Sequence, residues 1–479
     1  MKNFLNKIEL KPKALVGLIL AVVFIIIGCS LPSLEFTHLS FNSDQVKTLA
    51  VLLAFLCVLI SEALPIVITS FLFIGLLFFM GIAKDSSGAA SLKVALDGFS
   101  DPVVYFTLAS FGLAAAFTTT PIAKRILKKL LKAFGKSINL AILALMVCTA
   151  LISSIISNVP TCAVFMSIAL SFLNIYENEE DKKRTGKVLM IGIPMASMIG
   201  GMMTPAGSSI NLIAIGLLER NYDVTISFVK WMAVGVPLAV VLLPIAWLLL
   251  IKIFKPALLS KEKIQDFVKN IDVPDKVTLV EIKAWVIALT MLTLWVLSSW
   301  FTFFNVMAIS LIGAALLMFP GIKVISVDTF IKENSWDAFF LVGTVLSLGT
   351  VMKNNEVISA ITSCLPNFNM QLFFFLLIVC LIVFLFLIIL PVATSLITLI
   401  GAALMALGVL SGINPTLVIL CAALCASNCY LLPLDTVMLI TYGQGYYSMT
   451  DCLKVSAILQ VIMALLCSSW ITLIGPILF

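Results

Sequence analysis

The side chains best suited to chemistry in this chain are hydroxyl and amide groups in the middle of apolar sequence. Residues 153–161 read SSIISNVPT and lie between apolar arms at residues 140–151 and 163–173. Each arm is shorter than the roughly 20 residues of a spanning helix. Polar backbone at membrane depth persists only where it is buried in protein or lines a watery cavity. The pattern predicts a re-entrant hairpin over residues 138–175 with a binding site at its tip. A proline-kinked helix pair is the alternative.

A second group of small and polar residues interrupts the apolar segment 188–218. Glycines, a proline, serines and an asparagine fall together between Gly200 and Asn211. Gly and Pro unwind a helix, so Ser and Asn can then present oxygens at mid-membrane, as in the discontinuous helices of transporters. A glycine-rich contact between helices is the alternative interpretation.

Asp435 lies within apolar sequence near the end of the chain. A carboxylate buried alone costs several kcal/mol and tends to take up a proton. Asp435 is therefore a candidate cation-binding or proton-coupling site. Alternatively, it caps a half-helix through backbone N–H groups.

The other reactive side chains are 11 cysteines, almost all in apolar runs, and one histidine, His38, in an early loop. Cys421, Cys425 and Cys429 recur at helical spacing. This spacing would suit a stripe of soft-metal ligands but is more typical of small residues at a helix contact. A His-based metal site or Ser–His pair in the membrane is excluded. With no paired acids at helical spacing either, an enzyme is not expected.

The composition places these groups in a polytopic helical membrane protein. The chain is 61% hydrophobic and 11% charged, with a mean hydropathy of +1.17, whereas soluble chains carry about 25% charged residues. The net charge of +6 comes mainly from loop lysines and arginines. It therefore bears on orientation and lipid headgroups, and nucleic acid is not an expected partner.

Basic loops predict the orientation in a bacterial inner membrane. Lysines 2, 7, 11 and 13 precede the first span, and further basic segments occupy residues 124–132, 177–187 and 252–276. The positive-inside rule places all of them in the cytoplasm, so the N-terminus is expected inside and the C-terminus outside. Residues 124–132 segregate apolar from basic side chains and resemble an interfacial helix on an anionic leaflet.

The second half repeats the pattern of the first roughly 230 residues later. A second hairpin is expected over residues 370–410, with its tip at 390–395, and a second broken helix over 415–445. The second hairpin should enter from the opposite side, and inverted repeats with broken helices are typical of secondary transporters. The sequence thus divides into N-terminal scaffold helices (1–100), repeat 1 (101–252), a cytoplasmic loop with scaffold helices (253–335) and repeat 2 (336–479), with about 11 transmembrane helices in all.

With these elements placed, the chain resembles the divalent anion/sodium symporter family of dicarboxylate, citrate and sulfate carriers over nearly its whole length. The family's Ser-Asn-Thr motif appears at the first tip as Ser157-Asn158-Val159, and Gly207-Ser208 and Asn211 match its first broken helix. The resemblance implies a homodimer in which a transport domain slides against a fixed scaffold, an elevator motion. It also implies one sodium site and a neighbouring substrate site, whose residues are Ser153, Ser157, Asn158 and Gly207 for sodium, and Ser157, Asn158 and Ser208 for substrate.

The second half departs from the family pattern. Leu390-Pro391-Val392 stands where the motif should recur, and Leu and Pro offer no side-chain ligand, so a second sodium site is in doubt. Both motif threonines are valine here. Thr161 and Thr394, each two residues further on, are candidates to substitute for them. Thr436 is a further candidate for substrate contact, and its neighbour Asp435 stands where the family has a small uncharged residue.

The sequence therefore predicts an all-α, elevator-type secondary active transporter of small di- or tricarboxylates, of the succinate, malate or citrate type, coupled to sodium. Hydroxyl, amide and carbonyl oxygens suit a hard cation, and half-helix N-termini suit a carboxylate. The alternatives are a sodium-independent or proton-coupled anion exchanger, or a sulfate transporter. A channel would instead favour a continuous polar pore. The expected partners are a small anionic solute, membrane lipids and a second copy of the chain.

Overall fold

The computed structural model describes residues 12–31, 33–36, 39–301, 303–357, 360, 370–389 and 392–479. Several residues named in the sequence predictions lie outside the described residues: Lys2, Lys7, Lys11, His38, Leu390 and Pro391. Apart from loops and a short antiparallel pair of strands, β1 (Leu34–Phe36) and β2 (Leu39–Phe41), the described chain is built of helices. The prediction of a helical membrane fold is confirmed.

Seven of the described helices are long and apolar enough to cross a bilayer, judged by length and composition. They are α2 (Pro12–Ser30), α3 (Ser43–Ser61), α6 (Pro102–Thr119), α12 (Phe228–Phe254), α14 (Leu279–Leu297), α17 (Trp336–Asn354) and α23 (Met449–Leu478). The other apolar helices are mostly shorter, and a short helix crosses only part of the hydrocarbon core. The total of about 11 spans therefore stays a prediction.

Polar residues set where the spans begin. At the start of α3, Asn42 Oδ1 accepts a hydrogen bond from Gln45 N, and Gln45 Oε1 accepts one from Asn42 N, each at 2.9 Å. At the start of α6, Asp101 Oδ1 accepts from Val103 N at 2.9 Å. Such caps satisfy N–H groups that the first helical turn leaves unpaired.

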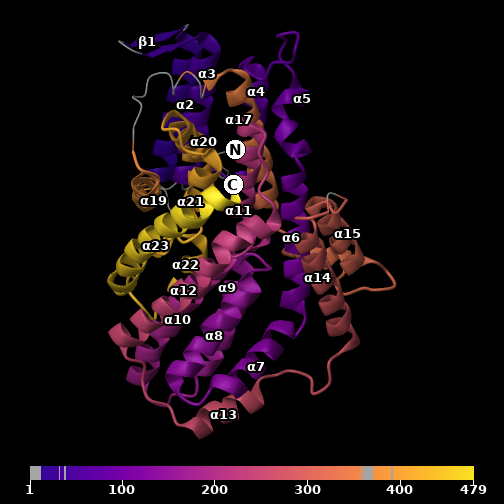
Figure 1. Ribbon diagram of the computed structural model, residues 1–479, viewed down its shortest axis with the longest axis vertical. Coiled ribbons are helices and arrows are strands. Elements are labelled where there is room, and N and C mark those ends of the chain that lie inside the picture. Colours follow the sequence, from indigo (N-terminus) through magenta and orange to yellow (C-terminus); the bar gives the residue numbers. More distant parts are fainter. Residues whose placement is uncertain are drawn as a thin grey trace, which may run out of the picture.

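Shorter helices connect the spans, and two of them form a basic end of the molecule. α7 (Ile122–Phe134) buries Leu127 and Leu131 and turns its lysines outward. Lys128 Nζ donates to Ile271 O at 3.1 Å, just beyond α13 (Lys261–Asn270). In Figure 1, α7 and α13 lie together at the lower end. Two shorter apolar helices are α4 (Ile66–Phe79) and α15 (Val306–Met318), and the short connectors are α5 (Leu92–Ala95), η1 (Asp97–Ser100) and α16 (Val327–Glu333).

Two helix pairs and two interrupted helices give the fold its inverted character. The pair α8 (Ile138–Ser153) and α9 (Asn158–Leu173) lies in the lower half of Figure 1, whereas α20 (Ala393–Leu410), the second arm of the pair that begins with α19 (Leu372–Ile389), lies in the upper half. The interrupted helices pass between them. The first consists of α10 (Glu179–Gly201), η2 (Pro205–Gly207) and α11 (Ser209–Tyr222), and the second of α21 (Pro415–Ala426) and α22 (Thr436–Tyr442).

The first halves of the two interrupted helices form the centre of the protein. Every residue from Val188 to Gly201 in α10 and from Thr416 to Ala426 in α21 is buried. By contrast, only 22% of the apolar window of α2 is buried, so this helix lies at the periphery. A helix that is apolar on all sides is stable only inside a protein or a bilayer. The deeply buried helices therefore hold the two breaks at the middle of the molecule.

Candidate functional site

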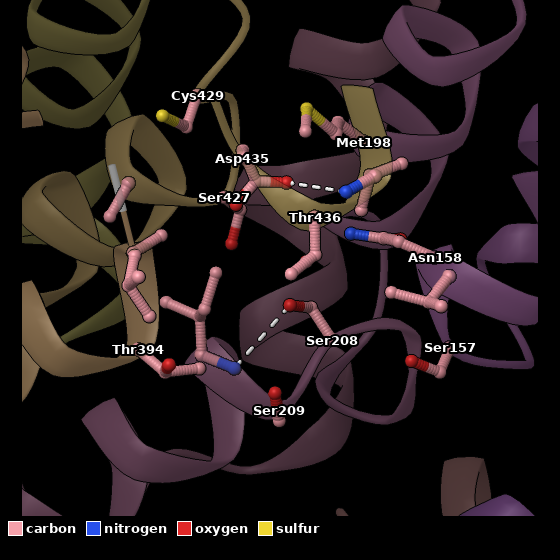
Figure 2. Close-up of a pocket in the computed structure, with 16 residues that line it drawn as sticks. Ser157, Asn158, Met198, Ser208, Ser209, Thr394, Ser427, Cys429, Asp435 and Thr436 are labelled. Carbon is pink, nitrogen blue, oxygen red and sulfur yellow. Dashed lines mark hydrogen bonds between the residues drawn. The ribbon is translucent and has the colours of Figure 1, made fainter. Parts of the chain in front are cut away.

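One cavity lies where the two helix pairs meet the two breaks. It encloses about 480 Å³ of empty space, part of it open to solvent, and sixteen residues line it. The polar lining residues labelled in Figure 2 come from both halves of the chain. They are Ser157, Asn158, Ser208, Ser209, Thr394, Ser427, Asp435 and Thr436. Ser157 and Thr394, which the sequence places 237 residues apart, thus face the same space.

Four helices begin at the wall of this cavity. The residues that precede their first turns are Ser157 for α9, Ser208 for α11, Val392 for α20 and Asp435 for α22, and all four line the cavity. Each helix N-terminus presents unpaired N–H groups and a partial positive charge. No lysine, arginine or histidine is among the described lining residues, so this positive potential comes from backbone alone.

The four helices differ in whether a side chain already caps their first N–H groups. Ser208 Oγ accepts from Ile210 N at 3.4 Å, and Asp435 Oδ1 accepts from Val437 N at 2.9 Å; Figure 2 shows both bonds. The helices α9 and α20, in contrast, begin without a side-chain cap. Their first N–H groups therefore remain available to a ligand in the cavity.

Beside the cavity, the first tip forms a tight polar cluster with α10. The Asn158 amide lies 2.8 Å from Ser153 Oγ, and Ser153 Oγ lies 3.0 Å from Ser197 Oγ. With its nitrogen facing acceptors, the Asn158 amide donates to Ser197 O at 3.0 Å and to Gly207 O at 3.2 Å. Ser153, Asn158 and Gly207 thus converge at one point. Ser197 was missed by the sequence analysis, because nothing in its local pattern in α10 sets it apart.

Two glycines of the first break permit this convergence. A Cβ at Gly201 would lie 2.0 Å from the end of the Asn158 side-chain amide, and one at Gly207 would lie 2.5 Å from Gly201 O. Real Cβ atoms do not approach other atoms so closely. A side chain at Gly201 would therefore displace the Asn158 side chain, and one at Gly207 would require the backbone at Gly201 to move. The glycines therefore do more than unwind the helix: they let the hairpin tip and the break touch.

The first break is held open by side-chain hydrogen bonds to its own backbone. Asn211 Nδ2 donates to Gly201 O at 2.9 Å and to Thr204 O at 2.8 Å, and the Thr204 hydroxyl donates to Ser154 O in the first tip. These bonds satisfy the buried carbonyls of Gly201 and Ser154 and add a second donor to Thr204 O, which also accepts from Gly207 N at 3.2 Å. Asn211 acts in this way as a brace for the break.

All but one of the residues predicted to bind substrate and sodium fall into two groups. Ser157, Asn158, Ser208, Thr394, Asp435 and Thr436 line the cavity; Ser153 and Gly207 belong to the adjacent cluster. Thr161 is not in either group. Its hydroxyl donates to Ser157 O at 3.0 Å and its side chain is fully buried. Ser209 and Ser427 line the cavity but were not singled out, although Ser209 directly follows Ser208 in the sequence.

Asp435 is buried and makes its hydrogen bond to backbone, in the geometry of a helix cap. Within the described part of the chain no ion pair involves this carboxylate. The capping geometry considered for Asp435 in the sequence is therefore present. It does not exclude a coupling role, because the same side chain also faces the cavity.

Comparisons with known proteins show the family of the chain. The sequence model of the family described as the sodium:sulfate symporter transmembrane region matches residues 12–479. An uncharacterized transporter of Haemophilus influenzae is 33% identical over 208 residues, which are 43% of this chain and 42% of that protein. The sodium-dependent dicarboxylate transporter SdcS of Staphylococcus aureus is 29% identical over 198 residues, which are 40% of this chain and 37% of that protein. The matched segments therefore span about two fifths of these relatives.

Two solved structures share the fold over nearly the whole chain. The Alcanivorax borkumensis YdaH transporter has a TM-score of 0.55 at 12% identity, covering 97% of this chain and 98% of that one. Neisseria gonorrhoeae MtrF has a TM-score of 0.56 at 11% identity, and the match covers 97% of this chain and 95% of that one. Identities this low show likeness of fold alone. The family match over residues 12–479 shows that the chain belongs to the sodium:sulfate symporter family, the divalent anion/sodium symporters.

Proposed function

We propose that this protein is a secondary active transporter that moves a small di- or tricarboxylate, of the succinate, malate or citrate type, together with sodium. The observation that carries the proposal is the cavity at which α9, α11 and α20, each of 14 residues or more, begin. Helix N-termini attract carboxylates through their N–H groups and aligned peptide dipoles. The likeness to a relative named as a sodium-dependent dicarboxylate transporter supports this substrate class and this ion.

The substrate carboxylates would bind at the uncapped starts of α9 and α20. Ser157 and Thr394 stand beside these two starts, and Asn158 and Ser208 add an amide and a hydroxyl. Thr436 offers one more hydroxyl from the second break. A ligand with two carboxylates could bind at both helix starts at once. A small inorganic anion such as sulfate is shorter and would bridge the two starts less well.

Sodium would bind beside the substrate, where Ser153, Ser157 and Gly207 offer hydroxyl and carbonyl oxygens. The Asn158 amide, whose nitrogen faces Ser153 and Gly207 in this structure, would turn its oxygen toward the ion. These are the ligand types that hard cations prefer. A cation there would also lower the repulsion between the substrate and Asp435. Binding of the two solutes would then be mutually favourable, as coupling requires.

Asp435 favours a second candidate, a sodium-independent anion exchanger in which this carboxylate takes up a proton. The residue faces the cavity, and among the described residues it has no cationic partner. Sulfate is a third candidate substrate, in line with the description of the family. These alternatives differ in ion dependence and selectivity, so one set of measurements separates them.

The remaining features of the proposal concern assembly and orientation. A homodimer in the bacterial inner membrane would let a domain of helix pairs and interrupted helices slide against a fixed scaffold. The basic helices α7 and α13 would face the cytoplasm. Lys230 Nζ, at the opposite end of α12 from Lys252, lies 5.2 Å from the Phe479 ring centroid, which supports an outside C-terminus. Cross-linking in native membranes and reporter fusions at residues 1 and 479 would test these points.

Titration of the purified protein with succinate, citrate and sulfate, each with and without sodium, tests the function directly. We expect binding of succinate or citrate, followed by intrinsic fluorescence, only when sodium is present. Ser157→Ala should weaken this binding by on the order of tenfold, the effect of one lost hydrogen bond to a charged group. Ser171→Ala is the matched control, because Ser171 lies exposed in the same helix and donates to Ser167 O.

Counterflow in proteoliposomes separates symport from exchange. Uptake of labelled succinate driven by a sodium gradient, and absent without sodium, agrees with the proposal. If counterflow of succinate were as fast in sodium-free vesicles as in vesicles with sodium, the protein would be an exchanger instead. Binding of sulfate alone, with neither carboxylate, would overturn the proposed substrate class.

A further inference from the structure

Away from the substrate cavity, four cysteines of repeat 2 meet inside the protein. Their sulfur atoms, from Cys380 in α19, Cys421 and Cys425 in α21, and Cys467 in α23, all lie within 4.8 Å of one another. The Cys380 and Cys421 sulfurs are 3.2 Å apart, and those of Cys421 and Cys467 are 3.9 Å apart. All four side chains are fully buried. In Figure 1 the three helices that carry them lie side by side.

The cluster differs from the stripe that the sequence suggested. Helical spacing links Cys421, Cys425 and Cys429, but the Cys429 side chain lines the substrate cavity and is not part of the cluster. The cluster contains Cys380 and Cys467 instead. These two cysteines lie on other helices and are separated from Cys421 by 41 and 46 residues in the sequence. None of the four clustered cysteines lines the cavity. The cluster is therefore separate from the transport site.

The sulfur positions match the coordination shell of a single metal ion. Zinc binds thiolates at about 2.3 Å in tetrahedral geometry, which places neighbouring sulfurs about 3.8 Å apart. The separations of 3.2 and 3.9 Å fall on either side of this value, and the upper limit of 4.8 Å leaves room for one ion at the centre. Four sulfur ligands without oxygen or imidazole select soft ions of this kind.

We propose that Cys380, Cys421, Cys425 and Cys467 form a structural site for one thiophilic metal ion, with Zn²⁺ as the natural occupant. Cysteine binds a metal as the thiolate, so all four thiols release their protons when Zn²⁺ binds, and the loaded site carries a net charge of −2. A charge in apolar surroundings is costly, so the thiolates form only together with the ion that they bind.

The ion would clamp three helices that pack around the second break. α19 is an arm of the second helix pair, α21 is the first half of the second interrupted helix, and α23 is the last helix. Cys425 lies two residues before Ser427, which lines the substrate cavity. The metal would thus fix the end of α21 without touching the substrate, and it would do so whatever the transported solute is.

Metal analysis of the full-length protein tests the proposal. Protein purified without chelators should contain close to one zinc ion per chain by inductively coupled plasma mass spectrometry. Cys467→Ala should lose this metal. Cys452→Ala is the matched control and should keep it, because Cys452 is a buried cysteine of the same helix whose sulfur contacts Tyr430 O and Ser456 Oγ instead.

Cobalt substitution gives a readout that does not depend on a variant folding. Wild-type protein that has been stripped of metal and loaded with Co²⁺ should show the intense thiolate-to-cobalt absorption of a tetrahedral sulfur site, and Zn²⁺ should displace it. Zinc should also raise the melting temperature of the stripped protein. These results would support the site even if Cys467→Ala could not be purified.

Three outcomes would overturn the proposal. Absence of bound metal together with failure to take up Co²⁺ or Zn²⁺ would show that the four cysteines serve packing alone. Loss of two titratable thiols in denatured, unreduced wild-type protein, traced by peptide mapping to Cys380 and Cys421, would assign a disulfide to this pair. Metal retained equally by Cys467→Ala would place the ion at another site.

Discussion

Ser427 Oγ donates a hydrogen bond to Asn211 Oδ1 at 3.0 Å and so joins the two interrupted helices, 216 residues apart in the sequence. Asn211 at the same time pairs two carbonyl groups of the first break, Gly201 O and Thr204 O. One amide therefore both stabilises the break in its own helix and fixes that break against the other. Through Ser427, which lines the cavity, this contact reaches the transport site.

The first prediction concerns Asn211. Asn211→Ala removes three hydrogen bonds in a buried region and leaves the Gly201 carbonyl without its partner, whereas Thr204 O keeps its bond from Gly207 N. Hydrogen bonds inside membrane proteins contribute about 0.6–1.7 kcal/mol each, so we expect a loss of about 2–4 kcal/mol of stability and a marked fall in transport. Thermal unfolding in detergent measures the first effect. Asn221→Ala, which removes a bond to Leu217 O in the same helix, should be much milder; equal effects would show that Asn211 is no brace.

The second prediction concerns Gly201. A methyl group at this position would collide with the Asn158 side chain. Gly201→Ala should therefore displace Asn158 and abolish sodium-dependent binding. Gly75→Ala is the control, because a Cβ at Gly75 meets no atom within 4 Å, and replacing a helical glycine by alanine gains up to about 1 kcal/mol. Sodium titrations that are unchanged in Gly201→Ala would exclude a sodium site at this cluster.

The third prediction concerns Asp435. Asn caps helices as well as Asp does, so Asp435→Asn should keep the fold. It removes a negative charge from the cavity wall, and we expect a dicarboxylate to bind more tightly, by on the order of tenfold, or 1.4 kcal/mol. Isothermal titration at fixed sodium concentration measures this change. Asp223→Asn, at an exposed site after α11, provides the matched loss of charge.

Three other results for Asp435→Asn would change the assignment. Loss of sodium dependence would identify Asp435 as a cation ligand. Loss of the pH dependence of transport, with sodium having no effect, would identify it as a proton carrier. A variant with unaltered substrate affinity, sodium dependence and pH dependence would reduce Asp435 to a helix cap.

The fourth prediction concerns an ion pair between α7 and α14. Arg125 Nε and Glu281 Oε2 are 2.7 Å apart, and the Glu281 side chain has no exposed surface. Arg125→Met leaves this carboxylate buried without its cationic partner, which should cost about 3–5 kcal/mol. The exposed pair Lys263–Glu177 is the control, and Lys263→Met should cost below about 1 kcal/mol. Melting temperatures of the two purified variants would distinguish the pairs, and similar shifts would contradict the prediction.

The sequence by itself determined the class of protein and the places where its helices stop. Apolar run lengths, polar interruptions and glycine–proline clusters are local features, and each acts within a few residues. For this reason the arms α8 and α9 fall within the segment 138–175 expected to form a hairpin, and the first break falls between Gly200 and Asn211. The family motif was readable for the same reason, since Ser157 and Asn158 are adjacent in the chain.

The tertiary structure alone decided which side chains meet. Ser197 and Ser427 join the site from helices whose local patterns resemble many others. Thr161, chosen for its nearness to Val159 in the sequence, instead points at the backbone of its own helix. The cysteine cluster likewise combines residues from three helices. It does not include Cys429, although Cys429 follows Cys421 and Cys425 at the same helical spacing. Contacts of this kind depend on how distant helices pack and rotate against one another, and the period of a single helix carries no information about its neighbours.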